Sequence, residues 1–123
     1  MVVPVLVITI FPRSNQLVQL KAPLPTVFVV DDDRTTRDDM QELLREHGYN
    51  AGTYATGEEF LAADRPDQSG CLVIDALMPG MGGIALLERL TAANRGLPAI
   101  IITGYGDVAM AVQAMRAGAA DFL

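Results

Sequence analysis

CLVIDALMPGMGG, residues 71–83, joins an apolar run to a loop through a single carboxylate. The run Cys71–Ile74 is apolar at every position, which is typical of a strand buried on both faces of a parallel sheet. It ends on Asp75, and the following segment, 76–83, contains one proline and three glycines. Such a segment is neither helix nor strand. Asp75 is therefore predicted to lie at the carboxyl end of a buried strand.

Similar β-branched and apolar runs occur on both sides of this stretch. Three aspartates, Asp31 to Asp33, follow the first of them, and Thr103 ends a later one, PAIIIT. A weaker candidate, Asn50–Tyr54, lies between the first run and Cys71. The predicted strands are Thr26–Val30, Asn50–Tyr54, Cys71–Ile74, Pro98–Thr103 and a segment that begins at Ala120 and reaches Leu123.

The segments between these strands have helical patterns. Arg34–His47 has Met40, Leu43, Leu44 and His47 at helical spacing, and Gly48 follows as a stop signal. Thr56 and Glu59 match a capping box for a short helix that runs to about Asp64. Two further helices are predicted. One runs from Ile84 to near Asn94. The other is capped by Asp107 and ends at Gly118, and one of its faces carries Val108, Ala111, Val112 and Met115.

Strands that alternate with helices predict an α/β fold with a doubly wound parallel sheet. The functional crevice of such sheets lies at the carboxyl ends of the strands. If the first, third and fourth strands are neighbours, Asp31, Asp32, Asp75 and Thr103 converge there. Clustered carboxylates repel one another unless they are neutralised, and their oxygens suit Mg²⁺. A carboxylate beside Mg²⁺ can attack a phosphoryl group in line, and a threonine hydroxyl can bind a phosphoryl oxygen.

Each of these residues also has a simpler interpretation. Asp31 to Asp33 could cap a helix, and Asp75 could start a turn before the proline and glycines. Thr103 alone would be an ordinary residue at a strand end. The functional interpretation is favoured because all of them occur together, at the same ends of the predicted strands.

Four motifs closely resemble those of response-regulator receiver domains of two-component signalling. They are VFVVDDD (27–33), LVIDALMPGMGG (72–83), AIIITGYGD (99–107) and AMRAGAADF (114–122). The resemblance covers 26–123 and is strongest to the subgroup that precedes transcription regulators. It implies a flavodoxin-like five-stranded parallel sheet of order 2-1-3-4-5, with a domain at 26–123.

The resemblance also implies a role for six residues. Asp75 would be the phosphoacceptor, Asp32, Asp75 and the backbone carbonyl of Leu77 would bind Mg²⁺, Asp31 would act largely through water, Thr103 would be the switch hydroxyl, and Phe122 would be the switch aromatic. The lysine and the final helix that the family has after the aromatic position would fall beyond Leu123. A sensor histidine kinase is the implied partner, and the implied location is the cytoplasm.

Three functions follow as alternatives from these observations. The favoured one is a phosphorylation-dependent switch, which accepts a phosphoryl group from a histidine kinase and catalyses only its own phosphorylation and dephosphorylation. The second is a docking domain that works without phosphorylation, and the third is a phosphatase with an aspartate nucleophile.

Nucleic-acid binding by this segment is disfavoured, because from Thr26 onward 15 acidic residues outnumber 7 basic ones, a balance of −8. The single cysteine, Cys71, excludes an internal disulfide and favours a reducing compartment.

Residues 1–25 form an apolar, proline-punctuated leader of different character. Its apolar part, Val2–Phe11, is shorter than the roughly 20 residues of a membrane-spanning helix, so no membrane partner is expected. The leader is either irregular or an added strand. In the second case, we expect Val3–Ile10 to lie against the sheet of its own chain or of a second copy. Two alternative homodimer interfaces are predicted, one through the face of the fourth helix and one through this leader strand.

Overall fold

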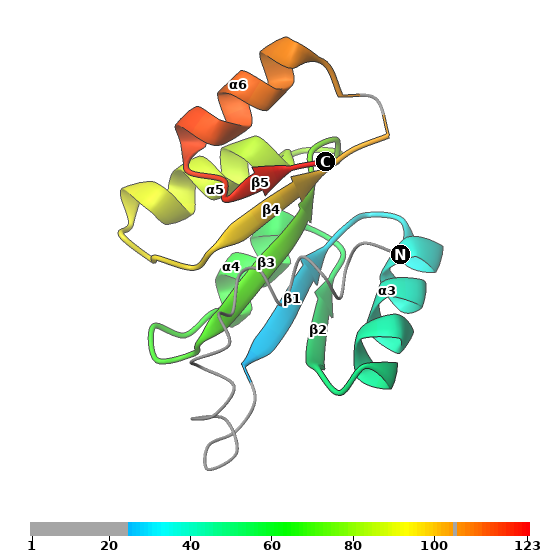
Figure 1. Cartoon of the computed structure of the whole chain (residues 1–123). Helices are drawn as coiled ribbons and strands as arrows, with labels where there is room; N and C mark the ends of the chain where they lie inside the picture. Colours follow the sequence, from blue (N-terminus) through cyan, green and yellow to red (C-terminus); the bar gives the residue numbers. More distant parts are fainter. Residues whose placement is uncertain (1–24, 105) are drawn as a thin grey trace.

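The structure, a computed structural model, describes residues 25–104 and 106–123. The expectations for the leader, including the strand Val3–Ile10, fall on residues outside this range, as does Tyr105. The described elements are β1 (Thr26–Val30), α3 (Arg34–Glu46), β2 (Asn50–Tyr54), α4 (Gly57–Ala63), β3 (Gly70–Asp75), α5 (Gly83–Ala92), β4 (Ala99–Ile102), α6 (Val108–Ala117) and β5 (Asp121–Phe122) (Figure 1).

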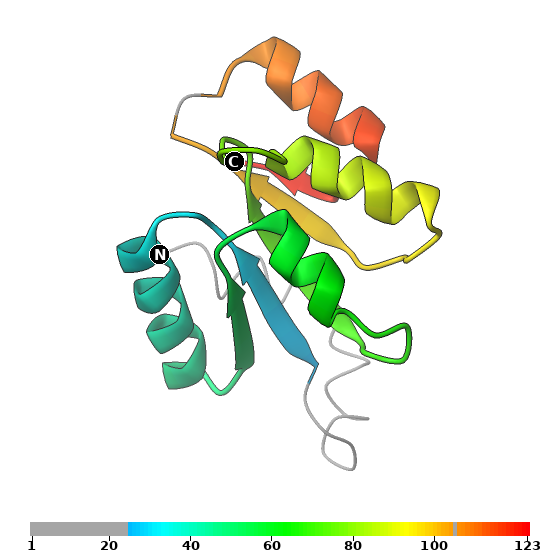
Figure 2. The same ribbon diagram turned by 180° about the vertical axis from the view of Figure 1, so that it is seen from behind.

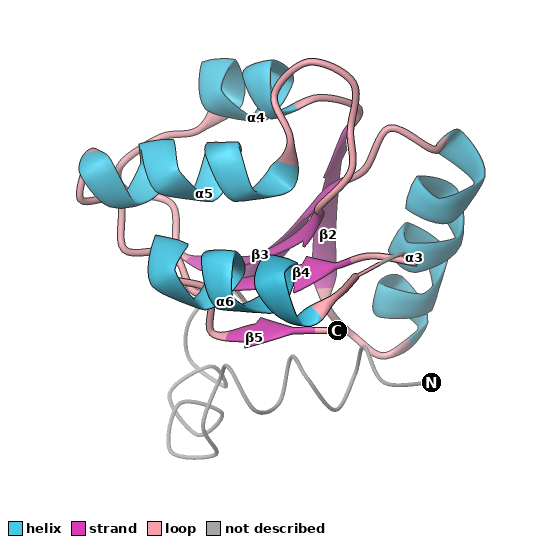
Figure 3. Ribbon diagram, turned by 90° about the horizontal axis from the view of Figure 1, so that it is seen from above, coloured by secondary structure: helices cyan, strands magenta, loops and turns pink. Residues whose placement is uncertain are grey.

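The five strands form one parallel sheet of order β2-β1-β3-β4-β5, which confirms the predicted topology. Side chains alternate between the two faces of each strand, so the sheet has a core on each side. On one side α4, α5 and α6 pack against Phe28, Leu72 and Ile101, and α4 and α5 lie in front of the sheet in Figure 2. On the other side α3 packs against Val27 and Val73. Figure 3 shows α3 apart from α4, α5 and α6.

Three polar side chains fix the beginnings of helices as the sequence predicts. The Glu59 amide donates to Thr56 Oγ1 at 3.0 Å, and the Met110 amide donates to Asp107 Oδ1 at 2.8 Å. At α3 the cap is Asp33, whose Oδ2 accepts from the Thr36 amide at 2.9 Å. The capping interpretation is therefore correct for Asp33, the third aspartate after β1.

Element boundaries differ from the predicted ones by one residue at several ends. The first helix ends at Glu46 and His47 is its C-cap, so His47 is exposed and does not belong to the buried face of Met40 and Leu44. Helix α5 begins at Gly83, one residue earlier than predicted. A side chain at Gly83 would collide with the backbone of Asp75, so the glycine allows α5 to start directly beside the end of β3.

The strands are also slightly shorter or longer than predicted. β3 gains Gly70 and Asp75, β4 lacks both ends of Pro98–Thr103, and β5 is limited to Asp121–Phe122. Strand ends fray into loops where pairing with a neighbour stops, so single-residue differences leave the topology unchanged.

The apolar face of α6 lies on the surface. Val108 is 81% exposed, and Val112 and Met115 are also exposed. The helix instead packs on the sheet and on α5 through Ala114 and Ala117. The helical spacing was thus predicted correctly, although small residues rather than large ones form the buried side. Among the described helices, none has both the length and the apolar character that crossing a bilayer requires.

Candidate functional site

The sheet register brings the predicted site residues together from three neighbouring strands. Val30 of β1 pairs with Ile74 of β3, so Asp31 and Asp75 both follow that pair. Asp75 in turn pairs with Ile102 of β4, which Thr103 follows. Because all three strands are parallel, these side chains share the same edge of the sheet.

Three carboxylates meet at this edge. Oxygens of Asp31, Asp32 and Asp75 all lie within 4.8 Å of one another. Asp31 is only 5% exposed, Asp75 is partly buried and Asp32 is exposed. An open pocket of about 800 Å³ leads to Asp31 and Asp75. It is lined by Asp31, Asp33, Thr36, Asp75, Ile102, Thr103, Gly104 and Leu123. The cluster is therefore accessible from solvent, with its deepest carboxylate at the base.

Backbone amides orient two of these carboxylates. The amide of Asp33 donates to Asp31 Oδ1 at 2.9 Å, and the amide of Leu77 donates to Asp75 Oδ1 at 3.1 Å. The second bond places Leu77 at the rim of the site, as its predicted role requires. Its proposed contribution through the backbone carbonyl stays a prediction.

Burial and mutual repulsion perturb the acidity of the cluster. Burial raises the pKa of Asp31 above its usual value, the Asp33 amide opposes this, and the charges of Asp75, Asp32 and Asp33 raise it further. Burial likewise raises the pKa of Asp75, with a smaller contribution from the charge of Asp32. A raised folded-state pKa means that protonation favours the fold, so this stability is present at low pH and is lost as pH rises through the folded-state pKa.

The donor set fits a hard divalent cation. Within residues 25–104 and 106–123, none of the three carboxylates forms an ion pair with a basic side chain. Three carboxylates held close without a counter-charge are suited to Mg²⁺, which binds oxygen ligands and retains several of its waters. The sequence prediction of a metal-binding site at Asp31, Asp32 and Asp75 is thus compatible with their geometry.

Of the two predicted switch residues, Thr103 lies at the acidic pocket and Phe122 lies on β5, against the hydrophobic core. Thr103 lines the pocket, and its amide donates to the carbonyl of Leu123 at 3.0 Å. Phe122 is partly buried on β5 and packs against the core. Gly106 lies close to both: a methyl group there would come within 2.7 Å of Thr103 Cγ2 and 2.8 Å of the Phe122 ring. A side chain at position 106 would therefore require Thr103 or Phe122 to shift.

Arg37, which contacts the site, was not predicted from the sequence. Its Nη1 donates to the backbone carbonyl of Asp31 at 2.8 Å, although Arg37 lies six residues further along the chain, in α3. An arginine one turn inside a helix has no distinctive sequence signal, because most such residues are exposed to solvent.

Comparisons with known proteins identify a family. Residues 27–123 match the model of the response regulator receiver domain. The chain is 43% identical over 99 residues to the C4-dicarboxylate transport transcriptional regulatory protein DctD of Rhizobium meliloti (strain 1021), covering 80% of this chain and 22% of that protein. It is 42% identical over 97 residues to the transcriptional regulatory protein FixJ of Bradyrhizobium diazoefficiens, covering 79% of this chain and 47% of FixJ.

Solved structures agree with these sequence relationships. The crystal structure of FixJ-N has a TM-score of 0.73 and 43% identity, with coverage of 80% of this chain and 78% of that one. Response regulator StyR has a TM-score of 0.76 and 51% identity, with coverage of 81% and 50%. The chain thus spans about a fifth to a half of the length of these curated relatives.

Proposed function

The chain belongs to the response regulator receiver domain family, and from this we propose that it is a phosphorylation-dependent signalling switch whose phosphoacceptor is Asp75. The observation that carries the proposal is the position of Asp75. It is the member of the carboxylate cluster that ends the central strand β3, and it opens onto the pocket between β1 and β4.

The chemistry is an in-line phosphoryl transfer. In the proposed reaction, a carboxylate oxygen of Asp75 forms a bond to phosphorus as the phosphorus–nitrogen bond of a kinase phosphohistidine breaks. The histidine nitrogen keeps the bonding electrons, and an acyl phosphate remains on Asp75. Thr103, which lines the same pocket, is placed to donate its hydroxyl to a phosphoryl oxygen.

Mg²⁺ would be held by Asp32, Asp75 and the backbone carbonyl of Leu77, with Asp31 acting through water. Bound there, the ion would neutralise negative charge on the transferring group. The protein residues do the rest: the Leu77 amide orients Asp75, and the Asp33 amide orients Asp31.

Incubation of the purified chain with Mg²⁺ and acetyl phosphate tests the proposal. We expect the intact mass to increase by one phosphoryl group, and omission of Mg²⁺ to prevent the increase. Sustained release of inorganic phosphate in many turnovers would favour an aspartate-nucleophile phosphatase instead. An unchanged mass would favour a docking domain that works without phosphorylation.

Binding of Mg²⁺ should raise the melting temperature of the chain. The ion relieves repulsion among Asp31, Asp32 and Asp75 and binds the folded state only. At an Mg²⁺ concentration of about 10 times Kd, the stabilisation is about 1.4 kcal/mol, which corresponds to about 5–10 °C for a domain of this size. Asp32→Asn should remove most of this shift, as measured by differential scanning calorimetry.

The matched control for this measurement is Asp38→Asn, which removes one exposed carboxylate from α3 outside the cluster. It should leave the Mg²⁺-dependent shift intact. If the shift survives in Asp32→Asn, the metal binds elsewhere in the chain.

A sensor histidine kinase is the partner that the family implies, and a transcription output in the cytoplasm is consistent with the names of the relatives.

The signal would leave the site through the loop before α6. Phosphorylation would draw Thr103 toward the phosphoryl group, and Gly106, which lies against Thr103 and Phe122, would move with it. Asp107, the next residue, caps α6. The exposed apolar face of α6 is then the surface whose affinity for a partner changes.

A second phosphorylated copy is the partner that we propose for the α6 face. Val108, Val112 and Met115 form an apolar strip that dimerisation would remove from water. We expect phosphorylation to increase the dimer fraction measured by size-exclusion chromatography with light scattering. Val112→Glu should reduce that fraction at least 10-fold, because it buries a charge in the interface.

Gln113→Glu serves as the control for the α6 variant. It adds the same charge to the same helix, next to α5 and away from the apolar strip. Equal loss of dimer in both variants would attribute the effect to net charge. A dimer that survives Val112→Glu would place the interface elsewhere.

A further inference from the structure

We infer that Arg37 is a positioning residue for the carboxylate cluster, acting through the backbone of Asp31. The guanidinium Nη1 of Arg37 donates to the Asp31 carbonyl at 2.8 Å. Arg37 contacts neither Asp32 nor Asp75 by a hydrogen bond or ion pair within the described residues, so its influence on them passes through the loop between β1 and α3. This inference rests on the proposed Mg²⁺-binding role of the cluster.

The loop has few fixed points, and Arg37 supplies one of them. The Asp31 amide donates to the carbonyl of Tyr54 at 3.1 Å, and this bond joins the start of the loop to the end of β2. Asp31 Oδ1 accepts from the Asp33 amide. The Asp31 carbonyl, the start of the peptide that leads to Asp32, is held by Arg37. Without that bond, the orientation of this peptide plane and of the Asp32 side chain is less constrained.

Helix α3 therefore holds the loop with two adjacent residues. The amide and the hydroxyl of Thr36 both donate to Asp33 Oδ2, at 2.9 and 2.6 Å. These two bonds lower the pKa of Asp33, and the nearby charge of Arg37 lowers it further. Three consecutive aspartates in a tight turn repel one another, and the first turn of α3 is the part of the fold that keeps them in place.

A matched comparison residue lies on the same helix. Arg34 is in the first turn of α3, and its side chain is 86% exposed. It pairs loosely with Asp38 at 3.7 Å, and within residues 25–104 and 106–123 it has no hydrogen bond to the loop. Both arginines carry the same charge, but only Arg37 contacts the Asp31 carbonyl. Long-range charge and local positioning can therefore be separated by mutation.

Positioning matters because Mg²⁺ demands a near-octahedral arrangement of oxygens at about 2.0–2.1 Å. Loss of a residue that orients metal ligands typically costs about 10–100-fold in metal affinity. We expect Arg37→Gln to raise the Kd for Mg²⁺ about 10-fold, measured by isothermal titration calorimetry on the full chain. Arg34→Gln should change Kd by less than about twofold, and Arg37→Lys, which keeps a donor and the charge, should recover part of the loss.

Amide hydrogen exchange of Asp33, measured by NMR without metal, provides an independent readout. Its bond to Asp31 Oδ1 reports the loop geometry, so Arg37→Gln should increase its exchange rate at least 10-fold relative to the wild type and to Arg34→Gln. Unchanged exchange in Arg37→Gln would overturn the inference, as would equal weakening of Mg²⁺ binding by both glutamine variants. Absence of Mg²⁺ binding in the wild type would instead contradict the proposed function, while the exchange rates would still test the role of Arg37 in the loop.

Discussion

Asp75→Asn is expected to abolish phosphorylation by acetyl phosphate, with a loss of more than about 100-fold in the rate of mass increase. The substitution keeps the size of the side chain and its hydrogen bond from the Leu77 amide. It removes the nucleophile, because an amide oxygen is a far poorer attacking group than a carboxylate oxygen. The loss should therefore be in chemistry rather than in folding.

The same variant should gain stability when Mg²⁺ is absent. The pKa of Asp75 is raised in the folded state, so its ionised form costs free energy at neutral pH. An uncharged asparagine avoids that cost, and it should weaken the dependence of the melting temperature on pH above about 4. A stable but inactive protein is the combined result that we expect from calorimetry and mass spectrometry.

Asp33→Asn is the control for the acceptor assignment. Asp33 lies in the same acidic pocket but serves as the N-cap of α3, a role that asparagine performs about equally well. It should retain phosphorylation. A phosphoryl group that still appears on Asp75→Asn would identify another acceptor, and peptide mapping would then distinguish Asp31 from Asp32.

The sheet could be predicted from the sequence because its strands are buried on both faces. Runs such as LVI before Asp75 and AIII before Thr103 must be apolar throughout, because both faces of these strands are buried. Such continuous apolar runs are easy to recognise in the sequence. The ends of the strands then locate the site. The proximity of the carboxylates then follows from the topology, because β1, β3 and β4 are neighbours in the sheet.

Other features depend on contacts between distant residues and left no comparable signal. The bond from Arg37 to the Asp31 carbonyl requires the first turn of α3 to lie over the loop, which only the folded structure specifies. The exposure of Val112 follows from the packing of α6 through Ala114 and Ala117, since small residues allow a close approach to the sheet. Periodicity predicts which residues share a face but not which face is buried.

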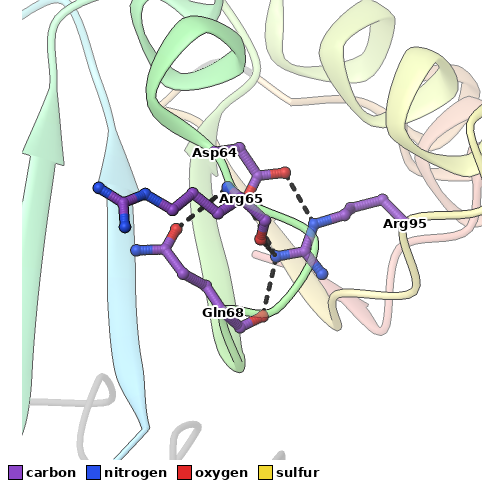
Figure 4. A network of polar contacts seen from close by, with 4 residues as sticks. All are labelled: Asp64, Arg65, Gln68 and Arg95. Carbon is purple, nitrogen blue, oxygen red and sulfur yellow. Dashed lines mark hydrogen bonds and ion pairs between the residues drawn. The ribbon is translucent and has the colours of Figure 1, made fainter.

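A third such feature is the clamp around Arg95, in the loops that precede β3 and β4 (Figure 4). The guanidinium forms a bidentate pair with Asp64, through Nε to Oδ2 at 2.7 Å and Nη2 to Oδ1 at 2.9 Å. Nη2 also donates to the carbonyls of Arg65 and Gln68 at 2.9 and 2.8 Å. One side chain after α5 therefore fixes the whole loop between α4 and β3.

This pair is partly buried, whereas the other ion pair of the described residues is exposed. The side chains of Arg95 and Asp64 are 13% and 10% exposed, whereas those of Arg34 and Asp38 are 86% and 64% exposed. An exposed pair of that kind contributes about 0–1 kcal/mol. Removing one partner of a fully buried pair costs about 3–5 kcal/mol, because the other charge is left without compensation, so a partly buried pair is expected to lie between these two limits.

Arg95→Ala is accordingly expected to lower the free energy of unfolding by about 2–3 kcal/mol, which corresponds to a fall of about 8–24 °C in melting temperature. Arg34→Ala, the matched control, should lower it by no more than about 1 kcal/mol. The double variant Arg95→Met with Asp64→Leu should recover much of the loss, because two apolar side chains leave no buried charge and the exposed carbonyls of Arg65 and Gln68 can bind water instead. Urea titrations followed by circular dichroism measure all three. Equal effects of Arg95→Ala and Arg34→Ala would show that the clamp contributes no more than a surface ion pair.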